Sequence, residues 1–322
     1  MRIIRMRFCP YLLVLVLAAS FGWSQESPLT DPSQTPGVLK TPSDKAEAPA
    51  PIKLEPDASG MVSQEQFREL LRYAQDREVE NEKHLHDYTY IEREEEHKLD
   101  SDGHVKKVES HTHEVLEVYG EPVERLIAKD DKPLSPEEAK KEEDRITKIT
   151  DKRKNESESD HRKRLEKEEK ERQEERKFVL EIADAFTFRL VGSETLDGRD
   201  TWVIEGEPRA GYQPKERSTK ILSKFKGRIW IDKAEAQWVK LDIVAIDSIS
   251  VGWFLARIHK GMHIEAEQTK INDEVWLPKH VAVQVGARLA LLKSVNEDVE
   301  ETFRDYKKFR ADSKITVMGE TQ

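Results

Sequence analysis

The chain has 322 residues, one cysteine, 37% charged residues and a formal net charge of −10 at pH 7. An acidic chain repels phosphate backbones, so nucleic acid is not among its predicted partners. The sequence contains no P-loop, dinucleotide fingerprint, zinc-protease motif or nucleophile elbow, so we predict no cofactor, no catalytic residue and no enzymatic activity.

The first 25 residues have the three parts of a secretory signal peptide. Arg2, Arg5 and Arg7 come first, the apolar run Tyr11–Ala19 follows, and small residues come next. A membrane-spanning helix needs about 20 apolar residues, and this run is shorter. We therefore expect cleavage rather than anchoring.

Cleavage changes what the chain carries. Loss of residues 1–25 removes Cys9 and three arginines, which leaves no thiol and lowers the net charge from −10 to −13. Cys9 precedes the apolar run, so an N-terminal lipid anchor is not expected. The predicted location is the periplasm or the outside of the cell, with no membrane span after cleavage.

The segment after the signal is predicted to be a disordered tether. Residues 26–60 contain seven prolines and few large apolar residues. Such a composition cannot offset the entropy lost on ordering the chain.

An amphipathic helix is expected next, over residues 64–80. The sequence Ser63 to Gln66 fits a capping box, which starts a helix. Four apolar residues then recur at helical spacing: Phe67, Leu70, Leu71 and Ala74. This stripe should pack the helix onto the rest of the fold.

From His86 the sequence changes to a period of two, which is typical of strands. The turn signal Asp100–Gly103 separates two alternating runs, and Glu124–Ala128 can add a third strand. Residues 61–134 are therefore predicted to hold the helix and the first β-hairpin of the domain.

This hairpin also holds a candidate metal site. A tight turn at Asp102 and Gly103 places Glu94 opposite His111, and Glu92 opposite His113, on one face of the sheet. Two imidazoles and two carboxylates can bind a divalent transition metal. Cross-strand pairing of acids with histidines on a solvated face is the alternative.

Residues 135–177 are predicted to form a charged helical insertion. They contain 15 basic and 15 acidic residues and almost no apolar face. Pairs of opposite charge three and four positions apart can stabilise a solvated helix. Ser135 begins the helix as N-cap, and a break is expected near Asn155 to Asp160.

A β-meander is predicted over residues 178–312, followed by a tail at 313–322. The alternating runs are separated by short turns such as Leu196–Arg199, and strands joined in this way pair antiparallel. The predicted class is α+β: one curved antiparallel sheet of roughly eight to eleven strands, an incomplete β-barrel covered by helices.

Three sequence patterns follow one another in this part of the chain: Gly227–Lys233, Glu274–Pro278 and the aromatic strand Phe303–Phe309. In this order, after the helix, hairpin and insertion, the chain resembles the outer-membrane lipoprotein-sorting superfamily over residues 61–312. The resemblance implies a half-barrel closed by helices, whose concave face binds acyl chains or another apolar ligand. It also implies a periplasmic location and a lipid or acylated client.

The apolar stretch Ile249–Arg257 is the predicted rim of this pocket, because it lacks alternation and contains Gly252. The predicted ligand contacts are Trp253, Phe254 and Leu255, together with Phe67 and Leu71 of the covering helix. Packing within the core is the alternative role for the same residues.

Two functions fit the sequence. One is a non-enzymatic envelope protein, a carrier or sensor, that binds a lipid or other apolar ligand. The other is an envelope scaffold or adaptor that binds a protein partner through the charged helix and the tether.

Overall fold

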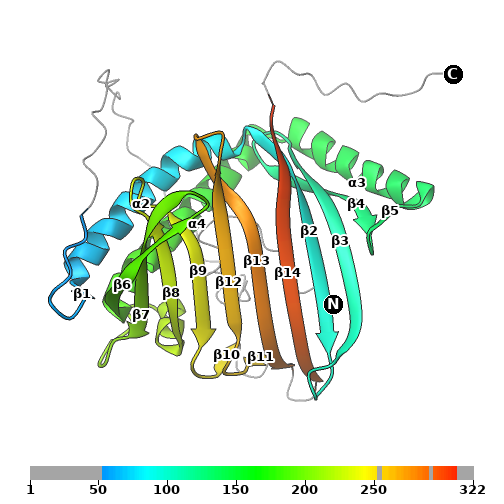
Figure 1. Ribbon diagram of the computed structural model, residues 1–322. Helices are drawn as coiled ribbons and strands as arrows, with labels where there is room; N and C mark the ends of the chain where they lie inside the picture. The colour runs from blue at the N-terminus through cyan, green and yellow to red at the C-terminus, as the bar shows by residue number, and fades with distance from the viewer. Residues whose placement is uncertain (1–52, 252–255, 290–292, 310–322) are drawn as a thin grey trace, which may run out of the picture.

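The computed structural model describes residues 53–251, 256–289 and 293–309. In these residues one fourteen-stranded antiparallel sheet curves around the helices and does not close on itself (Figure 1). The predicted α+β class and incomplete barrel are confirmed, whereas the predicted number of eight to eleven strands is too low for the described residues, because four short strands extend the sheet. The predicted signal peptide, the tether up to residue 52 and the tail at 313–322 lie outside the described residues.

The helices and strands have the following bounds. The described helices are α2 (Gln64–Leu85), α3 (Pro136–Lys154), α4 (Glu158–Ala185) and the 3₁₀ helix η1 (Ser218–Lys224). The long strands, in their order across the sheet, are β6 (Phe186–Leu196), β7 (Arg199–Pro208), β8 (Phe225–Asp232), β9 (Trp238–Ala245), β12 (His263–Ile271), β13 (Val275–Leu289), β14 (Lys293–Lys308), β2 (Tyr88–Leu99), β3 (Val105–Glu117) and β4 (Pro122–Lys129). Four short strands complete the sheet: β1 (Met61–Val62), β5 (Lys132–Pro133), β10 (Ile249–Val251) and β11 (Ala256–Ile258).

Most neighbouring strands are joined by short turns, as the sequence predicts. The pairing of β14 with β2 is different, because it joins the last strand of the domain to the N-terminal hairpin. In this pairing Glu301 lies opposite Glu94. The strands before and after the charged helices thus belong to one continuous sheet.

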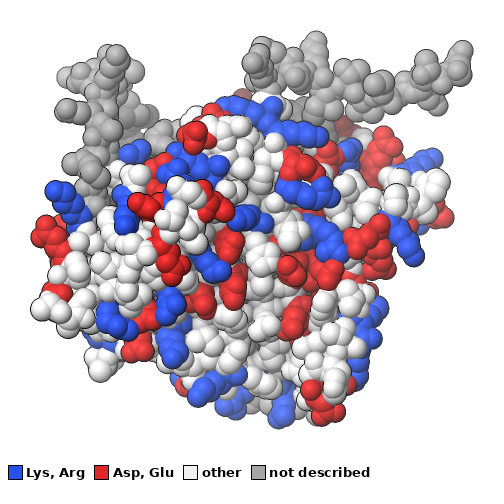
Figure 2. Space-filling model, in the orientation of Figure 1, with Lys and Arg blue, Asp and Glu red and all other residues white. Residues whose placement is uncertain are grey.

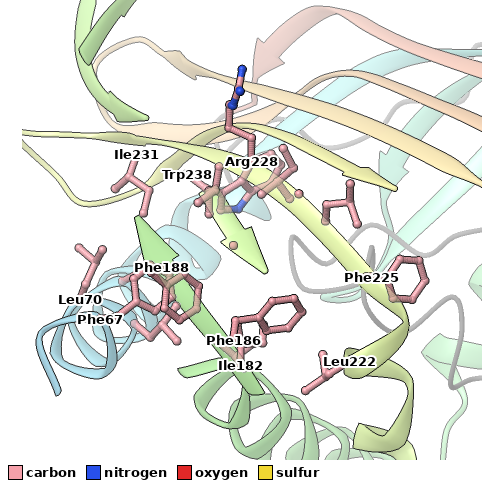
Figure 3. Close-up of a pocket in the computed structure, with 18 of the residues that line it drawn as sticks. Phe67, Leu70, Ile182, Phe186, Phe188, Leu222, Phe225, Arg228, Ile231 and Trp238 are labelled. Carbon is pink, nitrogen blue, oxygen red and sulfur yellow. The ribbon is translucent and has the colours of Figure 1, made fainter. Parts of the chain in front are cut away.

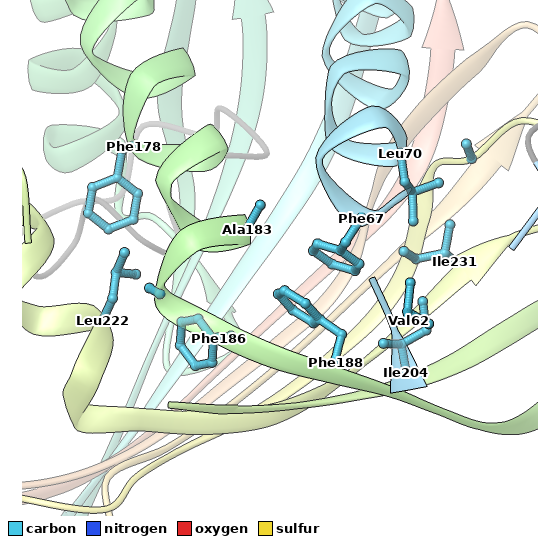
Figure 4. Packing of buried hydrophobic residues seen from close by; sticks show 12 residues of the cluster. Val62, Phe67, Leu70, Phe178, Ala183, Phe186, Phe188, Ile204, Leu222 and Ile231 are labelled. Carbon is cyan, nitrogen blue, oxygen red and sulfur yellow. The ribbon is translucent and has the colours of Figure 1, made fainter. Parts of the chain in front are cut away.

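Helix α2 covers the inner face of the sheet through its apolar stripe. Ser63 caps the helix by accepting a hydrogen bond from the backbone N–H of Gln66 at 3.2 Å. Phe67 and Leu70 are buried, and the Phe67 ring stacks on Phe188 of β6 with 3.5 Å between ring centroids (Figure 4). Burial of each such side chain contributes about 1.5–3 kcal/mol, so this stripe fixes the helix on the sheet.

The charged insertion forms α3 and α4, with the break where the sequence predicts it. The capping box at Ser135 is present in full, and none of the residues of α3 is buried. Helix α4 continues to Ala185, so the prediction of β-structure from residue 178 onward is wrong for this stretch. The physical reason is that Phe178, Val179 and Ala183 recur at helical spacing and pack into the core, with Phe178 beside Leu222 of η1 (Figure 4).

Polar contacts hold α3 and the start of α4 against the sheet. Glu121, in the turn between β3 and β4, accepts hydrogen bonds from Arg153 and from Arg164, the latter at 2.8 Å. Arg145 donates to the backbone oxygen of Glu124. The contacts of α3 with β4 are therefore ionic and hydrogen-bonded, in contrast to the apolar contacts of α2.

The outer face of the sheet carries ion pairs. Lys240 contacts Glu267 at 2.9 Å, and Arg228 contacts Glu205 at 2.6 Å. Acidic and basic side chains alternate across the face shown in Figure 2, without a patch of a single sign.

None of the described helices combines the length and the apolar character that crossing a bilayer requires.

Candidate ligand site

A cavity of about 220 Å³ lies between the inner face of the sheet and the covering helices. Its walls come from α2, α4, η1 and strands β6, β7, β8, β9 and β12. The apolar side chains that line it are Phe67, Leu70, Leu71, Ala74, Val179, Ile182, Phe186, Phe188, Ile221, Leu222, Phe225, Ile229, Ile231, Ala236, Trp238, Leu241, Ile243 and Ile264. An apolar cavity of this size can hold an apolar molecule.

Aromatic rings form one wall of the cavity. Phe186 and Phe188 alternate along β6 and therefore point to the same face, with 6.2 Å between their ring centroids. Phe67 approaches them from α2 (Figure 3). The guanidinium of Arg228 points away from these rings, so the wall is apolar.

Two glycines face each other where the cavity meets the sheet. Gly206 of β7 lies opposite Gly227 of β8. A Cβ atom at Gly206 would stand 3.5 Å from the Phe188 ring and 3.6 Å from the Phe186 ring. A Cβ atom at Gly227 would lie 2.4 Å from the backbone oxygen of Asp242, which only glycine avoids. The glycine at 206 leaves space beside the rings that a larger side chain would fill.

One corner of the cavity is polar. Gln75 of α2 donates to the backbone oxygen of Arg176 at 3.0 Å, and Asn81 donates to Glu78 at 3.5 Å. Asn81 also exchanges hydrogen bonds with the backbone of Trp276 in β13. These bonds hold α2 at a fixed position over the cavity.

The structure places two of the predicted ligand contacts in the cavity wall. Phe67 is 2% exposed and Leu71 is half-buried, and both line the cavity. Trp253, Phe254 and Leu255 lie outside the described residues, so their role as ligand contacts stays a prediction.

Several wall residues were missed in the sequence. Ile182 and Val179 were missed because their segment was read as the start of the β-meander, although their spacing was helical. Phe186 and Phe188 were recognised as strand residues, and their alternation was the signal that both point inward. Trp238 gave no signal of its own.

The predicted metal ligands lie in the predicted register. Glu94 is opposite His111 and Glu92 is opposite His113, and the two imidazole rings stack with centroids 6.3 Å apart. Among the described residues, three donor atoms come within 4.8 Å of one another in two other groups: Asp100, Asp102 and His104, and Asp242, His263 and Glu265. Metal binding by the predicted ligands stays a prediction.

From β14 onward the inner face carries acidic side chains beside the buried apolar residues Phe303, Tyr90 and Val115. Glu301 is 6% exposed, and its Oε2 atom has no hydrogen-bond partner among the described residues. Burial, and then the negative charges of Glu94 and Glu124, raise the pKa of the Glu301 carboxyl to about 8. We call Glu301, Glu94, Glu92 and Glu124 the acidic end of the inner face.

Comparison with known proteins gives a distant likeness of fold. No protein-family model and no curated protein matches the chain. Among solved structures, an outer membrane lipoprotein-sorting protein domain from Vibrio parahaemolyticus is 13% identical, with 76% of this chain and 94% of that chain covered and a TM-score of 0.31. A DUF1329 family protein from Desulfovibrio piger is 11% identical, and a LolA superfamily protein from Nitrosomonas europaea is 10% identical. Each has a TM-score of 0.27, with 76% of this chain and 93% of that chain covered.

Two of these structures, from Vibrio parahaemolyticus and Nitrosomonas europaea, are described as lipoprotein-sorting and LolA superfamily proteins. At these identities and TM-scores the likeness says nothing of what this chain binds.

Proposed function

We propose that this protein is a non-enzymatic binding protein that holds an apolar chain, such as the acyl chain of a lipid, in the cavity beneath α2 and α4. The observation that carries the proposal is the apolar wall of the cavity, made of side chains from two helices and several strands. Apolar surface removed from water contributes about 25 cal/mol per Å², so such a wall favours a hydrocarbon chain over a polar ligand.

The proposal is tested with a neutral ligand, fluorescently labelled dodecanol, whose binding is followed by fluorescence titration. Gly206→Val should weaken binding at least tenfold, because the added methyl groups occupy the space beside Phe186 and Phe188. Gly192→Val is the matched control, since a Cβ atom there meets nothing within 4 Å. Failure of the natural protein to bind, or equal binding by both variants, would refute the proposal.

The predicted rim offers a second test of the same function. We expect the double substitution of Trp253 and Phe254 by alanine to weaken dodecanol binding by about tenfold, which corresponds to about 1.4 kcal/mol. Circular dichroism should show an unchanged fold. Loss of the fold instead would assign these residues to the core.

The cellular setting of this function is the envelope, most simply the periplasm. The support is the signal-like segment of residues 1–25. Sequencing the N-terminus of the protein recovered from cells tests it. Recovery of a membrane-bound form that retains Met1 would contradict export by cleavage.

A second candidate function is that of an adaptor for an envelope protein. Helix α3 supports it, because none of its residues is buried although the helix is fully capped. Binding of a protein partner that is lost on deletion of residues 136–154, with dodecanol binding retained, would establish the adaptor role.

A further inference from the structure

The inner face of the sheet passes from apolar to ionisable residues along single rows. Residues in register on neighbouring strands lie side by side on the same face. One such row, from β9 to β3, runs through Leu241, Ala266, Val281, Glu301, Glu94 and His111. The first residue lines the cavity and the last three are ionisable.

The neighbouring row is also apolar between the cavity and β14. It runs through Ile243, Ile264, Val283, Val299 and Glu96. Val283 and Val299 are half-buried, so the inner face stays apolar along this row between the cavity and Glu96. Three strand spacings separate Leu241 from Glu301, or about 14 Å, which is within reach of one extended ligand.

The carboxyl of Glu301 is the feature that points to a charged ligand group. It is buried, one of its oxygens has no partner among the described residues, and the nearest strand places Glu94 opposite it. Burying a polar group without a hydrogen bond is unfavourable, and a second carboxylate nearby adds to the cost. An ammonium group would donate a hydrogen bond to this oxygen and would be attracted by the neighbouring carboxylate of Glu94.

From this arrangement we infer that the ligand is a cationic amphiphile, with its apolar chain in the cavity and an ammonium group at the acidic end. The inference rests on the proposed function, because the cavity must first hold the chain. An anionic head group would be repelled by the carboxylates of Glu94 and Glu124. A neutral head group would be neither repelled nor attracted by their charge.

The ligand group is an ammonium rather than a metal ion. Zinc requires about four donors at 2.0–2.2 Å, so the donors must converge closely. Among the described residues, groups of three donors that lie this close together occur around Asp100 and around His263, and neither group includes Glu301 or Glu94. An alkylammonium needs only two carboxylates and can direct its remaining N–H group to water.

The inference is tested with three ligands that share one chain: dodecylamine, dodecanol and dodecanoate. Each displaces a labelled dodecanol from the full-length protein, below its aggregation threshold and with a chelator present. Dodecylamine should bind at least tenfold more tightly than dodecanol, and dodecanoate more weakly than dodecanol. The double substitution E94Q and E301Q should reduce the preference for the amine to under threefold.

Glu300→Gln is the matched control. Glu300 directly precedes Glu301 in the sequence but points to the outer face, where it contacts His280 at 3.0 Å, so its loss should leave the preference for the amine unchanged. Dodecanol binding without any preference for the amine in the natural protein overturns this inference alone. Failure of all three ligands to bind overturns the proposed function with it. The relative affinities of the three ligands for the natural protein test the inference even if the double variant does not fold.

Discussion

The two ends of the inner face share one sheet and differ in what covers them and what they contain. The strands from β6 to β13 carry apolar rows and are covered by α2 and the C-terminal part of α4, which contact them through buried apolar side chains. The strands β14, β2, β3 and β4 carry the acidic end, beside α3, which contacts β4 through ion pairs and hydrogen bonds.

The difference separates two physical roles. Apolar burial scales with area and is not directional, so the first region supplies stability and space for a chain. Carboxylates act through charge and hydrogen-bond geometry, so the second region discriminates between ligands. One continuous register joins them, and a single ligand can therefore contact both.

The largest effect is expected from the apolar region. Phe67→Ala removes a side chain that is 2% exposed and stacked on Phe188. We expect the free energy of unfolding to fall by about 3–5 kcal/mol, measured by urea denaturation. Leu165→Ala, on the exposed part of α4, is the control and should change it by about 0.5 kcal/mol or less.

At the acidic end, Glu301→Gln should raise the free energy of unfolding, whereas Phe67→Ala lowers it, and the gain should depend on pH. The folded protein keeps the Glu301 proton up to a pKa of about 8, while the unfolded chain releases it near 4.5. The stability of the natural protein therefore falls as pH rises between these values, and glutamine does not titrate. The stabilisation by Glu301→Gln should grow with pH, by at most about 1.4 kcal/mol per unit.

Urea denaturation at several values between pH 5 and pH 8 measures this growth. The matched variant Glu300→Gln on the outer face should show no such trend. A difference between Glu301→Gln and the natural protein that does not change with pH would mean that the carboxyl is ionised in the folded state.

A smaller effect is expected where α3 meets the sheet. Glu121→Gln weakens the contacts with Arg153 and Arg164, and a hydrogen bond between charged groups contributes about 1.5–3 kcal/mol. Amide hydrogen exchange should become faster by a corresponding factor in α3 and stay unchanged in α2. Equally faster hydrogen exchange in α3 and α2 would show that the two helices do not open independently of each other.

The smallest effect is expected on the outer face. Lys240→Gln removes an ion pair with Glu267 in which both side chains are about a quarter exposed. We expect a loss of under about 1 kcal/mol that disappears at high salt, because exposed pairs are screened. Urea denaturation at low and high ionic strength measures it, and a larger loss that persists in salt would assign Lys240 a structural role.

Local patterns in the sequence determined most of the elements of this fold. The capping residues Ser63 and Ser135 start α2 and α3, and the turn at Asp100–Gly103 sets the register of β2 with β3. Alternation predicted the antiparallel strands, because side chains of period two cover one face of a sheet. Such signals act over a few residues, so a single sequence is enough to read them.

Only the tertiary structure determined which strands distant in the sequence pair with each other in the sheet. The pairing of β14 with β2 places Glu301 against Glu94, more than two hundred positions away in the chain, and no local pattern specifies that contact. The C-terminal turns of α4 are helical because Phe178 and Val179 find a core to pack against. The cavity likewise depends on a glycine at 206 standing beside two rings of another strand, since empty space is a property of the packed chain.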